Sequence, residues 1–376
     1  MKKNELQTPA IVVDTDIMER NIRKYHGEAA AHGKELWPML KTHKSTEIIK
    51  MQLDAGATGV LCGTLDEAEA SASMGVHRIM YAYPVASREN IARVIELAKK
   101  HDMIIRLDDL TAASLVNEEA IKADVVLSYT IIVDLGLHRF GVLPDDVVSF
   151  ADAMSGYEGL KLRGLSAHPG HVYSAQNPSE VAGYVREEHG ILTKVSDALR
   201  RAGYTFDIVS SGTTPTFAGA MESEAINIYH PGNYVFHDAI QMSLGTATEA
   251  DCALTVLATV ISSPRSGEWM IDAGSKCLGL DLGAHGNDSI KGHGFVKGHP
   301  NVTVAALSEE VGRLVCKEDE HALTVGDKVE IIPNHSCSTA NLTDYLIAVR
   351  GDDVEGAIEV DIRGNKTKKI DRCLFK

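Results

Sequence analysis

Between about Gly33 and Gly245, short apolar runs alternate with amphipathic stretches that have helical spacing. Such alternation is typical of parallel strands joined by helical crossovers, and eight units of this size suit a closed (β/α)8 TIM barrel. A doubly wound open sheet is the alternative from the pattern alone, although no Gly-X-Gly-X-X-Gly turn follows the first run. The eight apolar runs are residues 36–40, 58–61, 78–81, 103–107, 125–133, 160–166, 206–209 and 225–228.

The two ends of the chain have a different pattern. Residues 9–14 are a β-branched run after a proline and predict a strand, and Asp16 is placed to cap a helix that reaches about His32. After about Gly245, β-branched runs separated by glycine-rich turns replace the amphipathic stretches and predict an all-β C-terminal domain. These runs are residues 254–261, 269–272, 302–307, 328–332 and 344–349.

The composition limits the possible binding partners of the protein and its expected cellular location. Of 376 residues, 44% are hydrophobic and 24% are charged, as in an ordinary globular protein. The formal net charge of −15 argues against nucleic acid or an anionic membrane as a partner. The six cysteines are scattered and fit reduced thiols. We expect a cytoplasmic protein, because no apolar run reaches the roughly 20 residues of a membrane span and no secretory signal follows the basic N-terminus.

Two residues near the C-terminal end, His335 and Cys337, are candidate metal ligands. In an extended segment residues i and i+2 point to the same side, so imidazole and thiolate would bind one borderline-soft divalent metal such as zinc. Two protein ligands leave open positions for water or a substrate oxygen, as a catalytic metal requires. A lone His-X-Cys is more often a loop histidine beside a buried cysteine, so the interpretation depends on the rest of the chain.

A lysine near the other end supplies the second part of a site. Lys41 ends the first predicted barrel strand, where barrel active sites gather, and a lysine there can form a Schiff base with a carbonyl cofactor or substrate. A surface lysine in a loop is the common alternative. Residues 210–216 and 231–234 follow the seventh and eighth strands, where barrels often bind phosphate. Their backbone amides, with the hydroxyls of Thr213 and Tyr234, predict a phosphate cradle opposite the lysine.

Eight short motifs occur in one order along nearly the whole chain. They are Lys41-Thr42-His43-Lys44, Asp134-X-Gly136-X-X-Arg139-X-Gly141, His168-Pro169-Gly170-His171-Val172-Tyr173, Gly212-Thr213-Thr214-Pro215-Thr216, Pro231-Gly232-Asn233-Tyr234, Asp272-Ala273-Gly274-Ser275-Lys276, Ser308-Glu309-Glu310 and Pro333-Asn334-His335-X-Cys337. Together they resemble the fold-type III pyridoxal-phosphate enzymes, in the branch of D-serine dehydratase and D-threonine aldolase. The resemblance implies an alanine racemase-like fold and a homodimer. It also implies a barrel over residues 17–248, and a β-domain of residues 249–376 joined by residues 1–16.

The resemblance implies a role for each matching residue. Lys41 would hold pyridoxal 5′-phosphate and move the Cα proton, and Arg139 would face the phenolic oxygen of the cofactor. His335 and Cys337 would bind the metal. His168 and Tyr173 resemble the corresponding residues of the dehydratases. The cofactor phosphate would be lined by Gly212, Thr213, Gly232, Asn233 and Tyr234.

The sequence departs from the family pattern at four positions. Trp37 and Met39 flank the proline where the family usually has arginine and histidine. His230 stands where an arginine usually precedes Pro-Gly, and Val311 where a histidine usually follows Ser-Glu-Glu. These changes affect expected substrate contacts more than cofactor attachment, and they fit an unusual substrate or altered chemistry at the β-carbon.

The expected activity is that of a lyase acting on a D-3-hydroxy amino acid. A metal that acts as a Lewis acid on the β-hydroxyl would favour loss of hydroxide, as in D-serine or D-threo-3-hydroxyaspartate dehydratases, and would give a 2-oxo acid and ammonia. A base on that hydroxyl would instead favour Cα–Cβ cleavage to glycine and an aldehyde, as in D-threonine aldolase. The histidine–cysteine ligand pair places the dehydratase ahead. An amino-acid racemase would need a second base and a non-catalytic cofactor carrier would lack the β-domain, so both rank lower.

Overall fold

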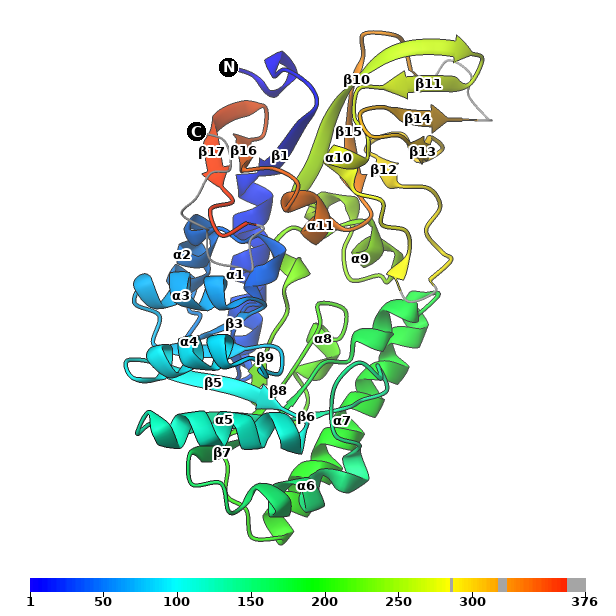
Figure 1. Cartoon of the computed structure of the whole chain (residues 1–376). Coiled ribbons are helices and arrows are strands. Elements are labelled where there is room, and N and C mark those ends of the chain that lie inside the picture. Colours follow the sequence, from blue (N-terminus) through cyan, green and yellow to red (C-terminus); the bar gives the residue numbers. More distant parts are fainter. Residues whose placement is uncertain (285–286, 317–322, 364–376) are drawn as a thin grey trace.

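The computed structural model describes residues 1–284, 287–316 and 323–363, and these residues form two sheets (Figure 1). A parallel eight-stranded sheet with helices around it forms the lower half of the view. A nine-stranded, mainly antiparallel sheet forms the upper half. No described helix is long and apolar enough to cross a membrane.

The parallel sheet has the strand order β2-β9-β8-β7-β6-β5-β4-β3. Its two edges meet through a parallel bridge between Met39 and Leu61, so the sheet closes on itself. The predicted (β/α)8 barrel is therefore confirmed, and the doubly wound open sheet is wrong. The strands are β2 (Glu35–Leu36), β3 (Val60–Cys62), β4 (Arg78–Tyr81), β5 (Asp102–Leu107), β6 (Leu127–Val133), β7 (Leu160–Ala167), β8 (Ile208–Ser211) and β9 (Ile228–Tyr229).

Short polar side chains fix where the helices begin. Ser45, Thr64 and Ser87 each accept a backbone N–H from the first turn of the helix that follows. The first helix is capped by Asp14, whose carboxylate accepts the N–H of Ile17 at 3.1 Å, and not by Asp16 as the sequence predicted. The helices of this half are α1 (Thr15–Ala31), α2 (Thr46–Asp54), α3 (Leu65–Ser73), α4 (Arg88–Ala98), α5 (Leu110–Lys122), α6 (Val147–Met154), α7 (Pro178–Arg201), α8 (Phe217–Ala220) and α9 (Ala239–Ser243).

The second sheet has the strand order β11-β14-β13-β12-β15-β10-β1-β16-β17, with the N-terminal strand between β10 and β16. All five predicted runs are strands. The sequence missed β12, β14 and β17, because each carries a glycine and few β-branched residues. The domain boundary at residues 248–249 stays a prediction, and residues 364–376 lie outside the described chain. The elements are β1 (Ala10–Asp14), β10 (Leu254–Arg265), β11 (Glu268–Ile271), α10 (Ser275–Leu278), β12 (Gly294–Val296), β13 (Thr303–Leu307), β14 (Gly312–Val315), β15 (Lys328–Pro333), α11 (Ser336–Ala340), β16 (Tyr345–Arg350) and β17 (Asp353–Glu359).

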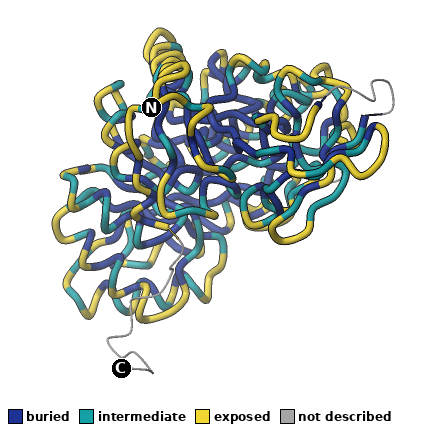
Figure 2. The backbone as a smooth tube through the Cα atoms, turned by 90° about the horizontal axis from the view of Figure 1, so that it is seen from above, coloured by how far each residue is buried: buried dark blue, intermediate teal, exposed yellow. Residues whose placement is uncertain are grey.

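The two sheets share one apolar core. A single cluster of buried side chains contains Leu40 from the barrel together with Val13 and Leu254 from the second sheet, and the buried backbone forms a continuous interior (Figure 2). A second cluster fills the inside of the barrel, so the space for a ligand lies at the barrel mouth, where α11 faces it. That cluster consists of Trp37, Met39, Leu61, Met80, Ala82, Ile104, Ile208 and Ile228.

Candidate active site

A cavity of about 200 Å³ lies at the carboxyl ends of the barrel strands. Part of its lining comes from the barrel, and another part comes from the segment of His335 and Cys337. Predicted site residues from both ends of the chain therefore meet here, whereas Tyr234 is absent from the lining. The predicted residues that line the cavity are Lys41, Arg139, His168, Tyr173, Gly212, Thr213, Gly232, Asn233, His335 and Cys337.

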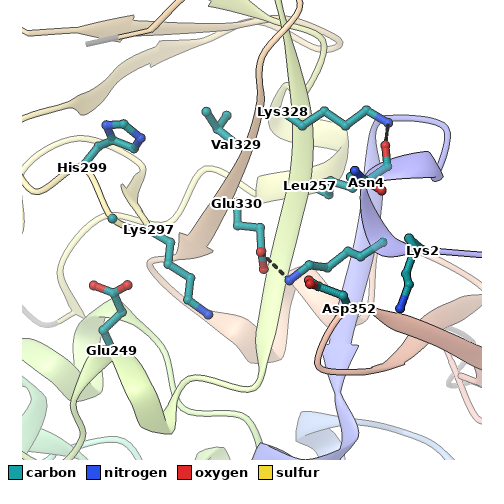
Figure 3. A pocket seen from close by; sticks show the side chains of 12 residues that line it. Lys2, Asn4, Glu249, Leu257, Lys297, His299, Lys328, Val329, Glu330 and Asp352 are labelled. Carbon is teal, nitrogen blue, oxygen red and sulfur yellow. Dashed lines mark hydrogen bonds and ion pairs between the residues drawn. The ribbon is translucent and has the colours of Figure 1, made fainter.

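A larger and more open hollow of about 650 Å³ lies beside the N-terminus, against the second sheet (Figure 3). Its charged groups are largely paired with one another or with the backbone. The Lys3 ammonium lies 2.6 Å from the Glu330 carboxylate, and Lys328 donates to the carbonyl oxygen of Asn4 at 2.7 Å. The smaller cavity is the better candidate site, because it brings together titratable groups from both sheets.

Lys41 lies in a short 3-10 turn, η2 (Leu40–Thr42), directly after the extended segment that closes the barrel. A Cβ atom on Gly63 would come within 3.1 Å of the Lys41 Cβ atom, so a glycine leaves room for this lysine. A buried ion pair between Lys44 and Glu67 supports the turn, and Glu67 also accepts the N–H of Gly63 at 2.6 Å. The Lys41 ammonium forms no ion pair with any residue that the structure describes, so it is available to a ligand.

Glycines bring the loops after β8 and β9 close to the cavity. Gly212 has a φ of 135°, which favours glycine, and a Cβ atom there would lie 3.0 Å from a backbone nitrogen of the next loop. A Cβ atom on Gly232 would lie 2.8 Å from the Thr42 hydroxyl. Thr213 and Asn233 add polar side chains, and Asn233 Oδ1 is buried without a partner among the described residues. These loops form a tight cradle of small and polar residues.

Tyr234 is placed differently from the expectation. Its hydroxyl accepts a hydrogen bond from Gln52 Nε2 at 3.0 Å and lies 3.1 Å from His26 Nε2. Its ring packs against Tyr25 with 4.8 Å between centroids. The side chain is fully buried, and burial raises the pKa of its hydroxyl. Tyr234 therefore connects α1 and α2 to the barrel, and it is not among the residues that line the cavity, so its expected contact with phosphate stays a prediction.

Arg139 lines the cavity from the loop after β6. Its guanidinium lies 5.2 Å from the ring centroid of Phe140 and 6.0 Å from that of Tyr83. Asp134 shapes this loop, because its carboxylate accepts the backbone N–H groups of Gly136 at 2.9 Å and His138 at 3.1 Å. The guanidinium has no carboxylate partner in the described chain, so its hydrogen-bond donors are available to an anionic ligand.

His168 and Tyr173 complete the barrel side of the cavity. His168 Nδ1 lies 3.3 Å from the carbonyl oxygen of Gly212, and burial, reinforced by the charges of Lys41 and Arg139, lowers the pKa of the imidazole to about 3. The ring is therefore neutral, with Nδ1 donating and Nε2 free to accept a hydrogen bond. Burial raises the pKa of the Tyr173 hydroxyl, which keeps it protonated.

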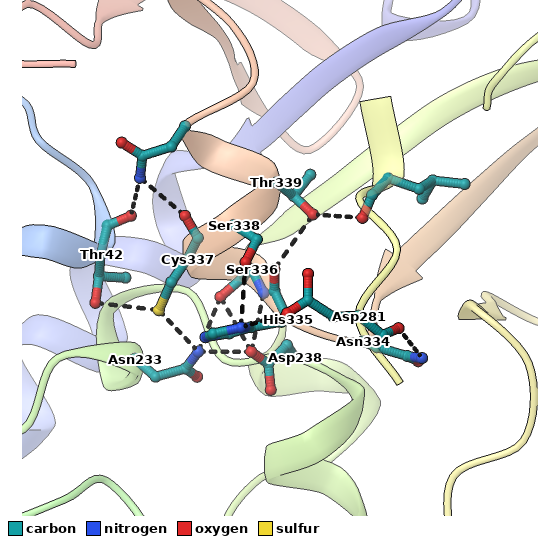
Figure 4. A network of polar contacts seen from close by, with 12 residues as sticks. Thr42, Asn233, Asp238, Asp281, Asn334, His335, Ser336, Cys337, Ser338 and Thr339 are labelled. Carbon is teal, nitrogen blue, oxygen red and sulfur yellow. Dashed lines mark hydrogen bonds and ion pairs between the residues drawn. The ribbon is translucent and has the colours of Figure 1, made fainter. Parts of the chain in front are cut away.

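His335 and Cys337 lie side by side at the start of α11 (Figure 4). The expectation of an extended segment is wrong in part: His335 is the extended residue before the helix, but Cys337 lies in its first turn. The Cys337 sulfur lies 3.3 Å from the Thr42 hydroxyl and 3.5 Å from Asn233 Nδ2. Burial opposes both charges, but mutual attraction prevails, so the pKa of His335 is raised and that of Cys337 is lowered. A thiolate beside an imidazole is a donor set that suits a soft divalent metal.

Arg106 on β5 was not predicted. Its side chain faces the cavity from inside the barrel and is only 4% exposed. Its Nε lies 3.2 Å from the sulfur of Met80, and its Nη2 has no partner among the described residues. Burial lowers the pKa of this guanidinium to about 9. A buried cation without a carboxylate is unfavourable unless a ligand supplies negative charge. The available signal was a lone charge in the apolar run 103–107.

Two of the four departures from the family pattern reach the cavity. Met39 and His230 line it, whereas Trp37 packs inside the barrel and Val311 lies outside the lining. His230 Nδ1 lies 3.0 Å from the carbonyl oxygen of Trp37. Burial holds the pKa of His230 well below its usual value, so a neutral imidazole stands where the family usually has a permanent cation.

Comparison with known proteins agrees with this architecture. The family model described as "Alanine racemase, N-terminal domain" matches residues 13–239, and the one described as "Putative serine dehydratase domain" matches residues 253–349. The chain is 31% identical to the D-serine dehydratase of Dictyostelium discoideum, over 92% of this chain and 94% of that protein.

Two solved structures extend the similarity. The D-threonine aldolase from Filomicrobium marinum superposes with a TM-score of 0.87 and 28% identity, over 96% of this chain and 97% of that one. A cysteine-to-alanine mutant of D-threo-3-hydroxyaspartate dehydratase, in its metal-free form, gives a TM-score of 0.88 and 28% identity, over 96% and 99%. The resemblance inferred from the motifs is confirmed, and the chain belongs to the alanine racemase-like family that includes D-serine dehydratase and D-threonine aldolase.

Proposed function

We propose that the protein is a lyase that uses pyridoxal 5′-phosphate and a divalent metal to eliminate water from a D-3-hydroxy amino acid; hydrolysis of the dehydrated product then gives a 2-oxo acid and ammonia. The observation that carries the proposal is that Lys41 and the His335–Cys337 pair line one cavity, with the Thr42 hydroxyl next to Lys41 lying 3.3 Å from the Cys337 sulfur. A base for the Cα proton and a ligand pair for the β-hydroxyl are thereby within reach of one small substrate. Similarity to a D-serine dehydratase over nearly the whole chain supports the reaction type.

The lining of the cavity fits a planar, anionic cofactor. Lys41, Arg106 and Arg139 supply positive charge, and the buried Nη2 of Arg106 lacks a protein partner in the described chain. Gly212 and Gly232 allow the backbone to approach a phosphate closely, because a Cβ atom at either position would crowd its neighbours. Bound pyridoxal 5′-phosphate supplies an electron sink that weakens the bonds at the substrate Cα.

In this proposal, the predicted residues that line the cavity have separate roles. Lys41 holds the cofactor and takes the Cα proton on its Nζ atom. Arg139 faces the phenolic oxygen and keeps it ionised. His168, which is neutral, and Tyr173 orient the bound cofactor and substrate on the barrel side. The cofactor phosphate is surrounded by Gly212, Thr213, Gly232 and Asn233.

The metal side of the proposal rests on His335 and Cys337. A thiolate ligand favours zinc over magnesium, and two protein ligands leave coordination positions for water or substrate. A metal held by these two residues would supply Lewis-acid chemistry, which would make the β-hydroxyl of the substrate a better leaving group. A related dehydratase has been solved as a mutant in its metal-free form, which supports metal binding by that protein and, we propose, by this one.

An aldolase that cleaves Cα–Cβ is the second candidate, because the structure of a D-threonine aldolase superposes closely on this chain. We place it second because its reaction needs a base on the β-hydroxyl, and the pairing of histidine with cysteine resembles the dehydratases. A racemase is less well supported: the tyrosines in the described cavity lining, Tyr83 and Tyr173, both come from the barrel, and a metal pair has no part in that reaction. The appended second sheet argues against a non-catalytic carrier.

The net charge and the family also support proposals for the class of ligand, the oligomeric state and the cellular location. A net charge of −15 argues against nucleic acid or an anionic membrane as a partner, and the named relatives support a small D-amino acid as the substrate. We further propose a homodimer in the cytoplasm, which light scattering of the purified protein tests directly for its oligomeric part.

One experiment separates these functions. The holoenzyme with zinc is incubated with D-serine, D-threonine and D-threo-3-hydroxyaspartate, and the products are measured. A 2-oxo acid with equimolar ammonia supports the dehydratase. Glycine with an aldehyde assigns the aldolase, and exchange of the α-proton with inversion but no cleavage assigns the racemase. The Lys41→Ala variant should be inactive with every substrate, and any activity it retained would contradict the proposed base.

A further inference from the structure

Behind the proposed metal ligand His335 lies an aspartate that the sequence did not single out. Asp281 Oδ1 lies 3.1 Å from His335 Nδ1, on the side of the ring opposite to the nitrogen that is left for a metal (Figure 4). Asp281 comes from the loop after α10, more than fifty positions earlier in the chain. Both side chains are partly buried, with 38% of His335 and 33% of Asp281 exposed, so the contact is partly shielded from water.

The Asp281 loop is attached to the His335 segment by several hydrogen bonds. Asn334 Nδ2 donates to the carbonyl oxygens of Asp281 and Gly292, each at 2.9 Å. The Thr339 hydroxyl donates to the carbonyl oxygen of Leu278 at 3.0 Å. Residues on both sides of His335 therefore fix the backbone of this loop. The backbone that carries the Asp281 carboxylate is therefore held in place, unlike that of a flexible surface loop.

The hydrogen bond decides which ring nitrogen can bind a metal. A carboxylate accepts a hydrogen bond, so Nδ1 of His335 must carry the proton and donate it to Asp281. The lone pair of the neutral ring then lies on Nε2. Histidines that bind metals commonly donate their other N–H to a carboxylate in this way, which fixes the tautomer and raises the basicity of the ligating nitrogen.

A second acidic residue, Asp238, also takes part in the hydrogen bonds around His335 and Cys337, but it does so in a different way. Asp238 is fully buried, and it accepts the N–H of Ser336 at 2.9 Å and the amide of Asn233 at 2.6 Å. It therefore fixes the backbone between His335 and Cys337, and it connects that backbone to the cradle loop after β9. Asp281 is the carboxylate that contacts the imidazole itself.

We propose that Asp281 is the positioning residue for the metal ligand His335, setting its tautomer and its orientation through the Nδ1 hydrogen bond. This inference rests on the proposed function, because it assumes that His335 binds the metal. The competing explanation is that the Asp281–His335 hydrogen bond is a purely structural tether, which only holds the Asp281 loop against the His335 segment. A tether would contribute to the stability of the metal-free protein, but its loss would leave the intrinsic affinity for metal unchanged.

Zinc affinity, measured by competition with a chromophoric chelator, tests the inference on the cofactor-loaded protein. Asp281→Ala should weaken zinc binding by about 10- to 100-fold, the usual effect of removing such a partner. Asp281→Asn keeps the size and an acceptor oxygen but loses the charge, so it should fall between Asp281→Ala and the native protein. Asp288→Asn, an exposed carboxylate of the same region, is the matched control and should bind zinc as the native protein does. The absorption spectrum of the bound cofactor should be the same in all four proteins.

Two further variants separate failure of the inference from failure of the proposed function. His335→Ala and Cys337→Ala should lose zinc binding. If they lose it while Asp281→Ala binds zinc with native affinity, Asp281 is a tether and the inference is overturned. If His335→Ala and Cys337→Ala bind zinc as the native protein does, the proposed metal site is wrong and the inference falls with it. Melting temperatures of the metal-free variants show whether each is folded, and Asp281→Asn serves as the test variant if Asp281→Ala is not.

Discussion

Glu188 is a buried acid beneath the proposed phosphate cradle, and its replacement by glutamine should change the pH dependence of stability. The residue lies on α7 and is 1% exposed. Its Oε1 accepts a hydrogen bond from the Ser211 hydroxyl at 2.5 Å, directly before Gly212, and its Oε2 has no partner among the described residues. Burial raises the pKa of this carboxyl from 4.5 to about 7.

The sign and size of the effect follow from that shift. The folded protein holds the proton more tightly than the unfolded chain, so the neutral carboxyl stabilises the fold fully below about pH 4.5. This contribution is lost as the pH rises through about 7. A shift of this size corresponds to about 3 kcal/mol of unfolding free energy. For a chain of 376 residues, that energy corresponds to roughly 4 °C in Tm.

Glu188→Gln resembles the protonated side chain and does not titrate. The difference in Tm between this variant and the native protein should therefore move by roughly 4 °C in favour of the variant between about pH 4.5 and 8. Scanning calorimetry of the cofactor-free proteins measures this, and comparing two pH values cancels any constant effect of the substitution. A difference that does not change with pH would refute the reasoning, because it would mean that Glu188 is ionised in the folded protein throughout this range.

The same charge should affect the cofactor. An ionised Glu188 adds a negative charge below the loop that we propose for phosphate, so affinity for pyridoxal 5′-phosphate should fall as the pH rises through about 7. Equilibrium titration of the two proteins should show that the ratio of native affinity to Glu188→Gln affinity falls over this pH range.

Further predictions concern the cavity itself. Lys41→Ala should abolish the cofactor absorbance, and borohydride reduction of the native holoenzyme followed by peptide mass analysis should label Lys41; another labelled lysine would contradict the assignment. Arg139→Ala should weaken cofactor retention and shift the absorption spectrum, whereas an unchanged spectrum and activity would make it a structural residue. Arg106→Leu should weaken cofactor binding about tenfold or more and leave the cofactor-free protein at least as stable, because it removes a buried cation that has no carboxylate partner in the described part of the chain. Native affinity in this variant would contradict a contact between Arg106 and the cofactor. Chelation should abolish turnover of a D-3-hydroxy amino acid and leave α-proton exchange intact, and full turnover in a protein shown to hold no metal would contradict the proposed mechanism.

The strands of the barrel were predictable because their signal is local. Apolar runs such as residues 78–81 and 103–107 are buried on both faces, and such strands read as continuous hydrophobic stretches. Strands β12 and β14 gave no such signal, since they are short and contain glycine, and their partners in the sheet complete their hydrogen bonds. Their pairing depends on where the rest of the second sheet lies.

The candidate site was predictable in its residue types and less so in its geometry. Lys41 and His335 were singled out because both lie in motifs that, together with six others, resemble those of one enzyme family. The orientation of Tyr234 was not predictable, because its hydroxyl is held by Gln52 and His26, which come from two other helices. Whether a polar side chain faces a cavity depends on whether neighbouring side chains form hydrogen bonds with it.

The sequence by itself determined the strand–helix alternation, the second β-rich region and the motifs that identify the family. Each of these features is a pattern of residues that are close together in the sequence. The tertiary structure alone decided that Asp281 lies behind His335, that Arg106 has no counter-ion among the residues the structure describes, and that Glu188 lies under the cradle loop. The physical reason is the same in each case. Burial and the distance between residues far apart in the chain set the charge and orientation of these groups, and both quantities depend on the folded chain and not on neighbouring residues in the sequence.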